Sequence, residues 1–432
     1  MTKTVKYIGT QTRWSELAAT GKQAVWFPGQ QEPRSDTEAA ALIATGQFQN
    51  LSDDVIEAAA AERLNALVSG DGIPALQALA QASKRRVRIA VGIDSLTDGA
   101  GGSTYRTDFA ARMQAQYGNP LLGMSGFDDG MDGLLTQNGM TAIQSLAWND
   151  PRRVKSFFGR GRYVSNTTTG SCDFSITTDP AVLPSAISIW VEFTAAAQKI
   201  YVKQFGASST TLQLYTSDNF PLNTPVRITY PLTVATGGGV KAGLAISNVD
   251  TVGANDIYFW AKEFHWADRA GVEVLNLGIG GASVANWAGL TAANFQRWVQ
   301  IIAADCWVIN AGMNDRSSGL NNANPFQDKV PNATTFGQNL RTVIDRITGA
   351  RPSDGVLVVP NEPSDVGTTG IGYYPDQIKA VAQGYGWRVA DDRAILGTYS
   401  QAAAAALMYD GVHPNAAGNA LRSLAYAAVF GA

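Results

Sequence analysis

VRIAVGIDSLTDG, residues 87–99, runs from a β-branched apolar segment straight into Asp94 and Ser95. Such an apolar run predicts a strand buried on both faces, as in a parallel sheet covered by helices. Open α/β sheets bind their ligands at the carboxyl ends of the strands, which is where Ser95 falls. Ser95 therefore has two interpretations: a cap for the following helix, or a residue that reacts.

The same alternation of strand and helix returns after residue 270. Further apolar strands are predicted in VEVLNLGIG (272–280), CWVINAGMND (306–315) and GVLVVPNEP (355–363). Helical spacing of apolar residues predicts helices over residues 106–118, 294–304, 336–348, 377–386 and 415–430. Strands alternating with helices indicate a parallel sheet covered on both faces. The predicted fold class is therefore α/β, and this domain comprises residues 86–150 and 269–432.

Residues 151–268 interrupt that alternation. They hold short segments with period-2 patterning, rich in Thr, Val and aromatic residues and separated by turns, such as AISIWVEFTA, VRITYPLTV and DIYFWAKEFHW. Short strands at this spacing predict an antiparallel β-sandwich. We therefore expect a sandwich inserted into the α/β domain.

Residues 1–85 precede both parts and are predicted to form a small α+β segment. Two strand-like pieces, TVKYIG and AVWFPG, come first, and helices are predicted over 35–48, 52–69 and 73–87. Ser52 can cap the second of these helices. We expect this segment to anchor the chain in a larger assembly; the alternative is a plain extension packed on the enzyme.

Composition excludes several classes of function. The net charge of −3 leaves no electrostatic footprint for nucleic acid. No apolar run is long enough to span a membrane, and the first residues lack the apolar core of a signal peptide. Cys172 and Cys306 are far apart and fit no metal-binding spacing, so we predict two buried thiols rather than a disulfide.

Only two histidines are present, which narrows the search for a catalytic base. His413 lies in YDGVHPN, three residues after Asp410, a spacing that lets the carboxylate reach the imidazole Nδ1–H. The alternative is an exposed loop before the last helix. His265 lies in YFWAKEFHW, where alternation puts it opposite Tyr258, Trp260, Phe264 and Trp266; we predict a surface or interface histidine.

Two more strand ends carry polar or glycine residues. Gly280 and Gly281 end one predicted strand, where a backbone N–H can approach a substrate oxygen without a side chain in the way. Asn314 ends the next one and offers a side-chain amide donor. Each pair alone is ordinary turn chemistry, but their order at successive strand ends is more specific.

These four pieces resemble the blocks of the SGNH (GDSL) hydrolases, which use Ser, Gly, Asn and His in this order. IDSLTDG resembles the first block, NLGIGGAS the second, GMND the third and DGVHPN the last. The first block departs from the family pattern, because Ile93 stands where the family has Gly. The resemblance implies that Ser95 is the nucleophile and His413 its base, oriented by Asp410. It also implies an oxyanion hole made by the backbone N–H groups of Ser95 and Gly281 and the Asn314 side chain, with no metal and no cofactor.

Some esterases of this family that remove O-acetyl groups from bacterial cell-wall glycans carry a carbohydrate-binding-like sandwich. Aromatic residues of the predicted sandwich, Trp260 and Trp266 above all, are candidates for stacking on sugar rings; the alternative for each is a core position. Further candidates are Trp190, Tyr201 and Tyr215. The N-terminal pattern, with FPGQ and TGQF, resembles short modules of tailed-phage structural proteins.

The sequence therefore predicts a serine esterase that removes O-acetyl or other short acyl groups from a bacterial surface polysaccharide, carried on a phage virion. One alternative is a general carboxylesterase or lipase-like enzyme. Another is a virion structural or glycan-binding protein with a weak or inactive hydrolase domain. The expected partners are the acetylated polysaccharide and other virion proteins. We expect the chain on the virion surface or, failing that, in the cytoplasm. Both a monomer and a homo-oligomer are compatible with the sequence.

Overall fold

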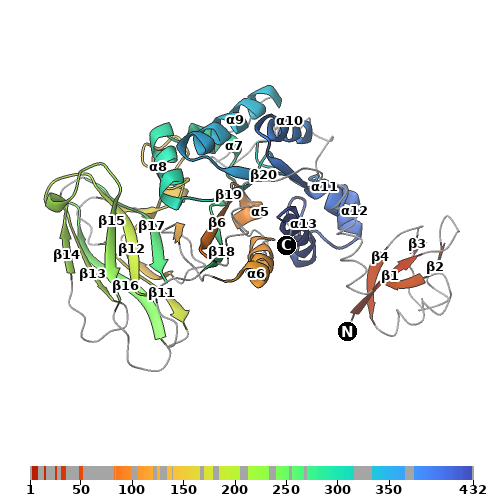
Figure 1. Cartoon of the computed structure of the whole chain (residues 1–432), viewed down its shortest axis with the longest axis horizontal. Helices are drawn as coiled ribbons and strands as arrows, with labels where there is room; N and C mark the ends of the chain where they lie inside the picture. The colour runs from red at the N-terminus through yellow and green to blue at the C-terminus, as the bar shows by residue number, and fades with distance from the viewer. Residues whose placement is uncertain are drawn as a thin grey trace.

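The computed structural model describes most of the chain from Ala82 onward and five short strands before it (Figure 1). The described residues are 2–7, 14–15, 25–26, 31–35, 48–51, 82, 84–98, 105–119, 124–126, 134–138, 140–165, 170–178, 184–204, 213–232, 240–252, 255–266, 270–315, 333–364 and 374–430.

A five-stranded parallel sheet stands at the centre of the α/β part. Its spatial order is β18-β6-β19-β20-β21, and every neighbouring pair is parallel. The strands are β6 (Arg86–Gly92), β18 (Gly271–Asn276), β19 (Cys306–Asn310), β20 (Asp354–Val359) and β21 (Arg388–Asp391). The order reverses direction at β6, the strand that leads into Ser95. This is the position at which open α/β sheets form a crevice for a ligand.

Successive side chains of these strands enter two different cores. Trp307 and Ile309 of β19 face a cluster that includes helices α7 to α10, whereas Cys306 and Val308 face a cluster with α6 and α13. The helices are α5 (Ser95–Asp98), α6 (Tyr105–Tyr117), α7 (Val284–Gly289), α8 (Ala292–Ile302), α9 (Ala333–Ala350), α10 (Pro375–Tyr385), α11 (Asp392–Leu396), α12 (Tyr399–Ala404) and α13 (Ala416–Val429). The predicted α/β fold class is therefore confirmed, with both faces of the parallel sheet covered.

Two antiparallel sheets form the sandwich on the other side of the molecule (Figure 1). One has the order β15-β12-β17-β10-β9 with β7 also paired to β17, and the other has β14-β13-β16-β11-β8. The strands are β7 (Met124–Gly126), β8 (Leu134–Asn138), β9 (Thr141–Ala142), β10 (Arg162–Val164), β11 (Gly170–Thr178), β12 (Ala186–Phe193), β13 (Lys199–Gln204), β14 (Gln213–Thr216), β15 (Val226–Pro231), β16 (Val240–Asp250) and β17 (Ile257–His265). Strands β7, β8 and β9 come before residue 151, so these sheets also draw on the chain upstream of the segment in which the sequence predicts the sandwich.

Strand β17 changes face in its middle, which the sequence does not predict. Its pairing with β12 skips Trp260, so that Trp190 lies opposite Ala261 and Val191 opposite Phe259. Such a bulge inverts which side chains face inward beyond it. Phe264 and Trp266 therefore lie in the sandwich core, while Trp260 points to the α/β part. The expectation that Tyr258, Trp260, Phe264 and Trp266 share one face is wrong for this reason.

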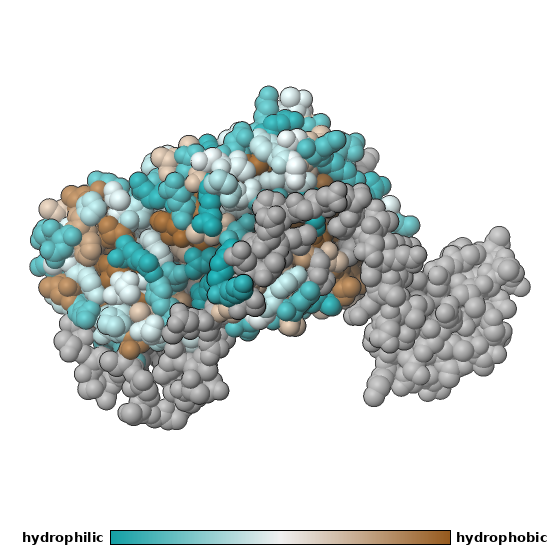
Figure 2. All heavy atoms as spheres, in the orientation of Figure 1, coloured by the Kyte–Doolittle hydropathy of each residue, from teal (hydrophilic) through white to brown (hydrophobic). Residues whose placement is uncertain are grey.

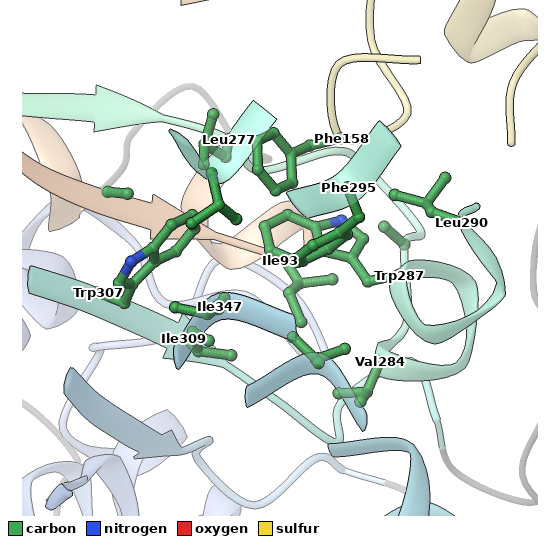
Figure 3. Close-up of a cluster of buried hydrophobic side chains, with 14 of the residues drawn as sticks. Ile93, Phe158, Leu277, Val284, Trp287, Leu290, Phe295, Trp307, Ile309 and Ile347 are labelled. Carbon is green, nitrogen blue, oxygen red and sulfur yellow. The ribbon is translucent and has the colours of Figure 1, made fainter. Parts of the chain in front are cut away.

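The sandwich and the α/β part share a hydrophobic core. Trp260 of β17 belongs to the same buried cluster as Trp287 and Trp298, and its ring lies 6.4 Å from that of Trp298. Figure 3 shows part of this cluster, with Phe158 beside Trp287 and Phe295. An ionic chain runs beside it: Arg227 pairs with Glu263, Glu263 with Arg88 of β6, and Arg88 with Glu273 of β18. The sandwich is therefore fixed against the central sheet.

The N-terminal strands pair only with one another among the described residues. β1 (Thr2–Tyr7) lies between β4 (Gln31–Ser35) and β5 (Phe48–Leu51), and β2 (Trp14–Ser15) pairs with β3 (Val25–Trp26). The helices predicted in this segment lie almost wholly outside the described residues.

In the described part of the chain, no helix is both long and apolar enough to cross a membrane. Figure 2 shows hydrophobic residues exposed in small patches on the sandwich, whereas the face near α9 and α10 is mainly hydrophilic.

Candidate active site

Ser95, His413 and Asp410 form one hydrogen-bonded chain. Ser95 Oγ lies 2.9 Å from His413 Nε2, and His413 Nδ1 lies 2.8 Å from Asp410 Oδ2. Ser95 begins α5, shortly after β6, whereas Asp410 and His413 lie just before α13. His413 is 318 positions from Ser95 in the sequence. The structure thus brings together the three residues that the sequence singles out, in the order that general-base activation of a serine requires.

Asp410 is held as an ionised hydrogen-bond acceptor. Its Oδ1 accepts the backbone N–H groups of Val412 and His413, each at 2.7 Å. Partial burial raises the pKa of Asp410, but the hydrogen bonds from His413 and Val412 outweigh it, and the net pKa lies below its ordinary value. A carboxylate on Nδ1 keeps that nitrogen protonated, which leaves the Nε2 lone pair directed at Ser95.

Residues 408–414, which we call the histidine turn, form a small hairpin. Met408 pairs with Pro414 in an antiparallel bridge, and Tyr409 N donates to His413 O at 2.7 Å. Asn415 continues this pairing through its N–H to Leu407 O and caps α13 by accepting from Gly418 N. The imidazole is therefore carried by a turn whose backbone is tied at both ends.

Two residues that support this turn are not singled out by the sequence. Asn361 is buried in the loop after β20, and its Nδ2 donates to Val412 O at 3.1 Å. Ser364 N donates to Gly411 O, and a Cβ on Gly411 would lie 2.4 Å from Ser364 Oγ, so a larger residue there would displace the Ser364 side chain. The sequence feature that could have pointed to them is the polar run NEPS (361–364), which follows a predicted parallel strand. Several of the other site residues also follow the carboxyl ends of such strands.

The nucleophile turn, residues 94–97, rests on a buried polar layer. Asp94 accepts Leu96 N at 3.0 Å, and Asn310 at the end of β19 donates to Thr97 Oγ1 and Tyr105 OH at 2.6 and 2.8 Å. Burial raises the pKa of Asp94 to about 7, against the opposing effect of the Arg422 charge. These contacts fix the backbone from which Ser95 projects.

The segment with Gly280 and Gly281 runs beside the nucleophile turn. Ile279 N donates to Ile93 O at 2.9 Å, so the two strand ends are hydrogen-bonded two residues before Gly281 and Ser95. Gly281 has φ of 76°, a conformation that favours glycine. The buried guanidinium of Arg160, from the segment that leads into β10, also donates to Gly278 O in this segment.

Asn314 and Asp315 hold the same segment from the end of β19. Asn314 Nδ2 donates to Ala282 O at 2.9 Å, next to Gly281. The carboxylate of Asp315 accepts Val284 N and Ala285 N at the start of α7, where the helix dipole favours an anion. The structure therefore brings Asn314 to the second block, as the resemblance implies, and adds Asp315 as a buried support that the sequence did not single out.

His265 is also hydrogen-bonded to a serine, in the sandwich. Its Nε2 lies 2.8 Å from Ser188 Oγ and 2.9 Å from an Arg227 nitrogen. Burial lowers the pKa of His265, which Glu263 opposes. His265 lies on the same side of its sheet as Trp190, which packs on the α/β part, in agreement with a surface or interface histidine.

The aromatic candidates for sugar binding are mostly buried. Trp260 is 0% and Trp266 9% exposed, so neither ring presents a face to a ligand, and their interpretation as sugar-stacking residues is wrong. Trp190 is buried as well, whereas Tyr201 and Tyr215 are partly exposed. Both cysteines are free, buried thiols, as predicted. Among the described residues, no group of three or more His, Cys, Asp or Glu side chains is arranged to hold a metal ion.

Comparison with known proteins gives a family match and a match of the fold. The model of the GDSL-like lipase/acylhydrolase family matches residues 251–421. No curated protein matches the sequence. A solved structure named as a peptidoglycan O-acetylesterase superposes with a TM-score of 0.55 at 16% identity, covering 82% of this chain and 94% of that chain. A carbohydrate esterase family 3 enzyme from Talaromyces cellulolyticus gives a TM-score of 0.25 at 21% identity, covering 36% and 69%. Residues 251–421 therefore resemble a GDSL-like acylhydrolase domain, and the fold of the chain is similar to that of the structure named as a peptidoglycan O-acetylesterase.

Proposed function

We propose that the protein is a serine esterase that removes O-acetyl groups from a bacterial surface polysaccharide. The observation that carries the proposal is the chain Ser95–His413–Asp410, with distances of 2.9 and 2.8 Å. The fold likeness to a protein named as a peptidoglycan O-acetylesterase supports an acetylated glycan over a lipid ester.

The first half of the reaction acylates Ser95. Its Oγ attacks the carbonyl carbon of the acetyl ester while the hydroxyl proton passes to His413 Nε2. The tetrahedral intermediate then collapses, the sugar oxygen takes the proton from His413, and the sugar alcohol leaves with the acetyl group bound to Ser95.

The second half releases acetate. Water attacks the acetyl-serine while His413 takes one of its protons, and Ser95 Oγ recovers that proton when acetate leaves. Asp410 stays ionised throughout, in keeping with its low pKa, and stabilises the imidazolium that forms in each half.

The oxyanion of each tetrahedral intermediate needs hydrogen-bond donors. We assign the backbone N–H groups of Ser95 and Gly281 and the Asn314 amide to this role. The support is their placement: Ile279 N on Ile93 O brings the Gly281 segment to the nucleophile turn, and Asn314 is oriented by Ala282 O. Loss of one such donor lowers kcat by about 10²–10³-fold.

Acetate release from O-acetylated polysaccharides tests the proposal directly. The wild-type protein is incubated with O-acetylated peptidoglycan and O-acetylated capsular polysaccharides, and free acetate is measured over time with Ser95→Ala as the blank. We expect Ser95-dependent release from at least one glycan. Release from short soluble esters together with none from any glycan would refute the assignment of the substrate and favour a general carboxylesterase.

The place of action is a separate proposal. We propose that residues 1–85 attach the esterase to a phage particle, on the strength of the sequence resemblance alone. Co-purification of the full chain with virions and the loss of that association on removal of the segment would support it; an equal distribution of both proteins would contradict it.

A further inference from the structure

An exposed aromatic ring adjoins the catalytic carboxylate. Tyr409 directly precedes Asp410 and is 63% exposed, the highest value among the four exposed large hydrophobic side chains of the described residues. The other three are Leu214, Leu222 and Val252, which lie in the sandwich. A single exposed aromatic needs no explanation by itself, so its position decides what it can do.

The register of the histidine turn puts Tyr409 on the side of His413. Met408 and Pro414 are partners in an antiparallel bridge, and Tyr409 N donates to His413 O, which makes Tyr409 and His413 the next opposed pair. Directly opposed residues of an antiparallel pair point to the same face. Pro414 is buried on the other face, which agrees with this alternation. The phenol ring and the imidazole therefore share the open face of the turn.

The backbone that carries Tyr409 is held by hydrogen bonds. Its N–H is bonded to His413 O, and the turn is held by Asn361 on Val412 O and by Ser364 on Gly411 O. A tyrosine side chain has two rotatable bonds and offers a large apolar face with a polar tip, so little conformational entropy is lost when a ligand packs on it.

We infer that Tyr409 is a specificity-determining residue that packs its ring on the pyranose next to the acetyl group being removed. A sugar ring presents apolar C–H groups on its faces and hydroxyls at its edge, which suits an aromatic face with solvent around it. This inference rests on the proposed function, and it assigns recognition of the glycan to the histidine turn rather than to the sandwich.

The test compares two esters that release the same product. Acetate release is measured with ethyl acetate, which has no ring, and with an O-acetylated oligosaccharide from the glycan that the wild type deacetylates best. We expect Tyr409→Ala to lower the ratio of kcat/KM for the oligosaccharide to kcat/KM for ethyl acetate by about three- to tenfold. Tyr409→Phe and Tyr409→Trp keep the ring and should hold the ratio within about twofold of wild type.

Tyr201→Ala is the comparison variant, because Tyr201 of β13 is a partly exposed tyrosine that the sequence names as an alternative candidate for stacking on sugar rings. Its ratio should equal that of the wild type. An unchanged ratio in Tyr409→Ala, an equal fall in Tyr409→Phe, or a fall in Tyr201→Ala alone would each overturn the inference. Failure of the wild type to deacetylate any oligosaccharide while it hydrolyses ethyl acetate would instead remove the proposed function, and the inference with it.

Discussion

The molecule contains two histidines, and each lies within hydrogen-bond distance of a serine hydroxyl. In the α/β part His413 Nε2 is 2.9 Å from Ser95 Oγ, and in the sandwich His265 Nε2 is 2.8 Å from Ser188 Oγ. The distances are nearly equal, so distance alone does not tell a catalytic pair from a structural one.

The other polar partners of the two imidazoles separate the two pairs. Asp410 lies on His413 Nδ1, which leaves Nε2 to accept the proton of Ser95. In His265 the Nε2 that meets Ser188 also lies 2.9 Å from the guanidinium of Arg227, which can donate hydrogen bonds but cannot accept them. The lone pair of His265 is thus shared with a cation that opposes its protonation.

The serines differ as much as the histidines. Ser95 stands at the carboxyl end of a parallel strand and is 9% exposed, whereas Ser188 is 0% exposed in the middle of a strand. Ser188 Oγ also meets Arg227 Nε at 2.9 Å and Thr229 Oγ1 at 2.7 Å. The comparison teaches that a reactive serine needs a strand end, a path for substrate and a base whose far nitrogen is fixed by a carboxylate.

Replacing the two serines should give the largest contrast. Ser95→Ala removes the nucleophile and should lower kcat on a short acetyl ester by about 10⁴–10⁶-fold. Ser188→Ala removes only a structural hydrogen-bond partner, so kcat should stay within about threefold while the free energy of unfolding falls by about 1–3 kcal/mol. Initial rates and urea unfolding curves measure both effects. Comparable losses of kcat in the two variants would erase the distinction.

The next largest effect is expected at the carboxylate behind His413. Asp410→Asn keeps the size of the side chain but no longer stabilises the imidazolium or the Nδ1–H tautomer, so kcat should fall by about 10³–10⁴-fold. Glu263→Gln is the matched control in the sandwich, where the carboxylate contacts Arg227 and Arg88. On folded protein its kcat should change less than tenfold. A drop in Asp410→Asn no greater than in the control would remove Asp410 from the triad.

The sequence was most informative where one residue type at a strand end carries the chemistry. Ser95 and Asn314 could be found because apolar strands are easy to recognise and their carboxyl ends meet at one edge. His413 could be found because the chain has only two histidines and Asp410 stands three residues before it. Asn361 and Asp315 escaped notice because their roles depend on backbone groups of other segments, Val412 O and Val284 N. Such partners are set by tertiary packing, which no local pattern encodes.

In the sandwich the sequence predicted strands but not the direction of their side chains. The strands from β12 onward could be predicted from period-2 patterning, but the side on which each aromatic falls could not. One skipped residue at Trp260 inverts the pattern of β17, and a bulge leaves no mark in the alternation of residue types. The same bulge puts His265 on the face with Arg227, so the sequence could not distinguish the two Ser–His pairs by their surroundings.

A smaller effect, on stability, is expected from the buried layer under Ser95. The folded pKa of Asp94 is about 7, above its ordinary value of 3.8, so between these values the folded protein holds a proton that the unfolded chain has lost. Stability from this group is therefore fully present below about pH 4 and is lost as the pH rises towards 7. Asp94→Asn cannot titrate and should weaken the fall in unfolding free energy from pH 4.5 to 7.5.

Urea unfolding at these two pH values measures that change. The fall should not vanish, because burial also raises the pKa of Asp315, to about 6, which acts in the same direction. An identical pH dependence in wild type and Asp94→Asn would show that Asp94 is ionised in the folded state. Ser188 instead contacts Thr229, Arg227 and His265.

The smallest effect on activity is expected from removing the N-terminal segment, which contains neither histidine. Strands β1 to β5 pair only among themselves in the part of the chain that the structure describes, and none of the four catalytic blocks lies there. A cut at residue 85 would nevertheless remove two contacts of the enzyme, because Ala82 is buried against the α6 and α13 side of the sheet and Arg85 pairs with Asp305 at 2.9 Å.

We therefore expect the chain lacking residues 1–81 to keep kcat/KM on a short acetyl ester within about twofold of the full chain. The chain lacking residues 1–85 should be somewhat less stable to urea, by about 1 kcal/mol for the exposed ion pair and the small buried side chain together. A folded but inactive protein after removal of residues 1–81 would mean that the N-terminal segment belongs to the catalytic unit, and that two regions rather than one hold His413 and Ser95 in place.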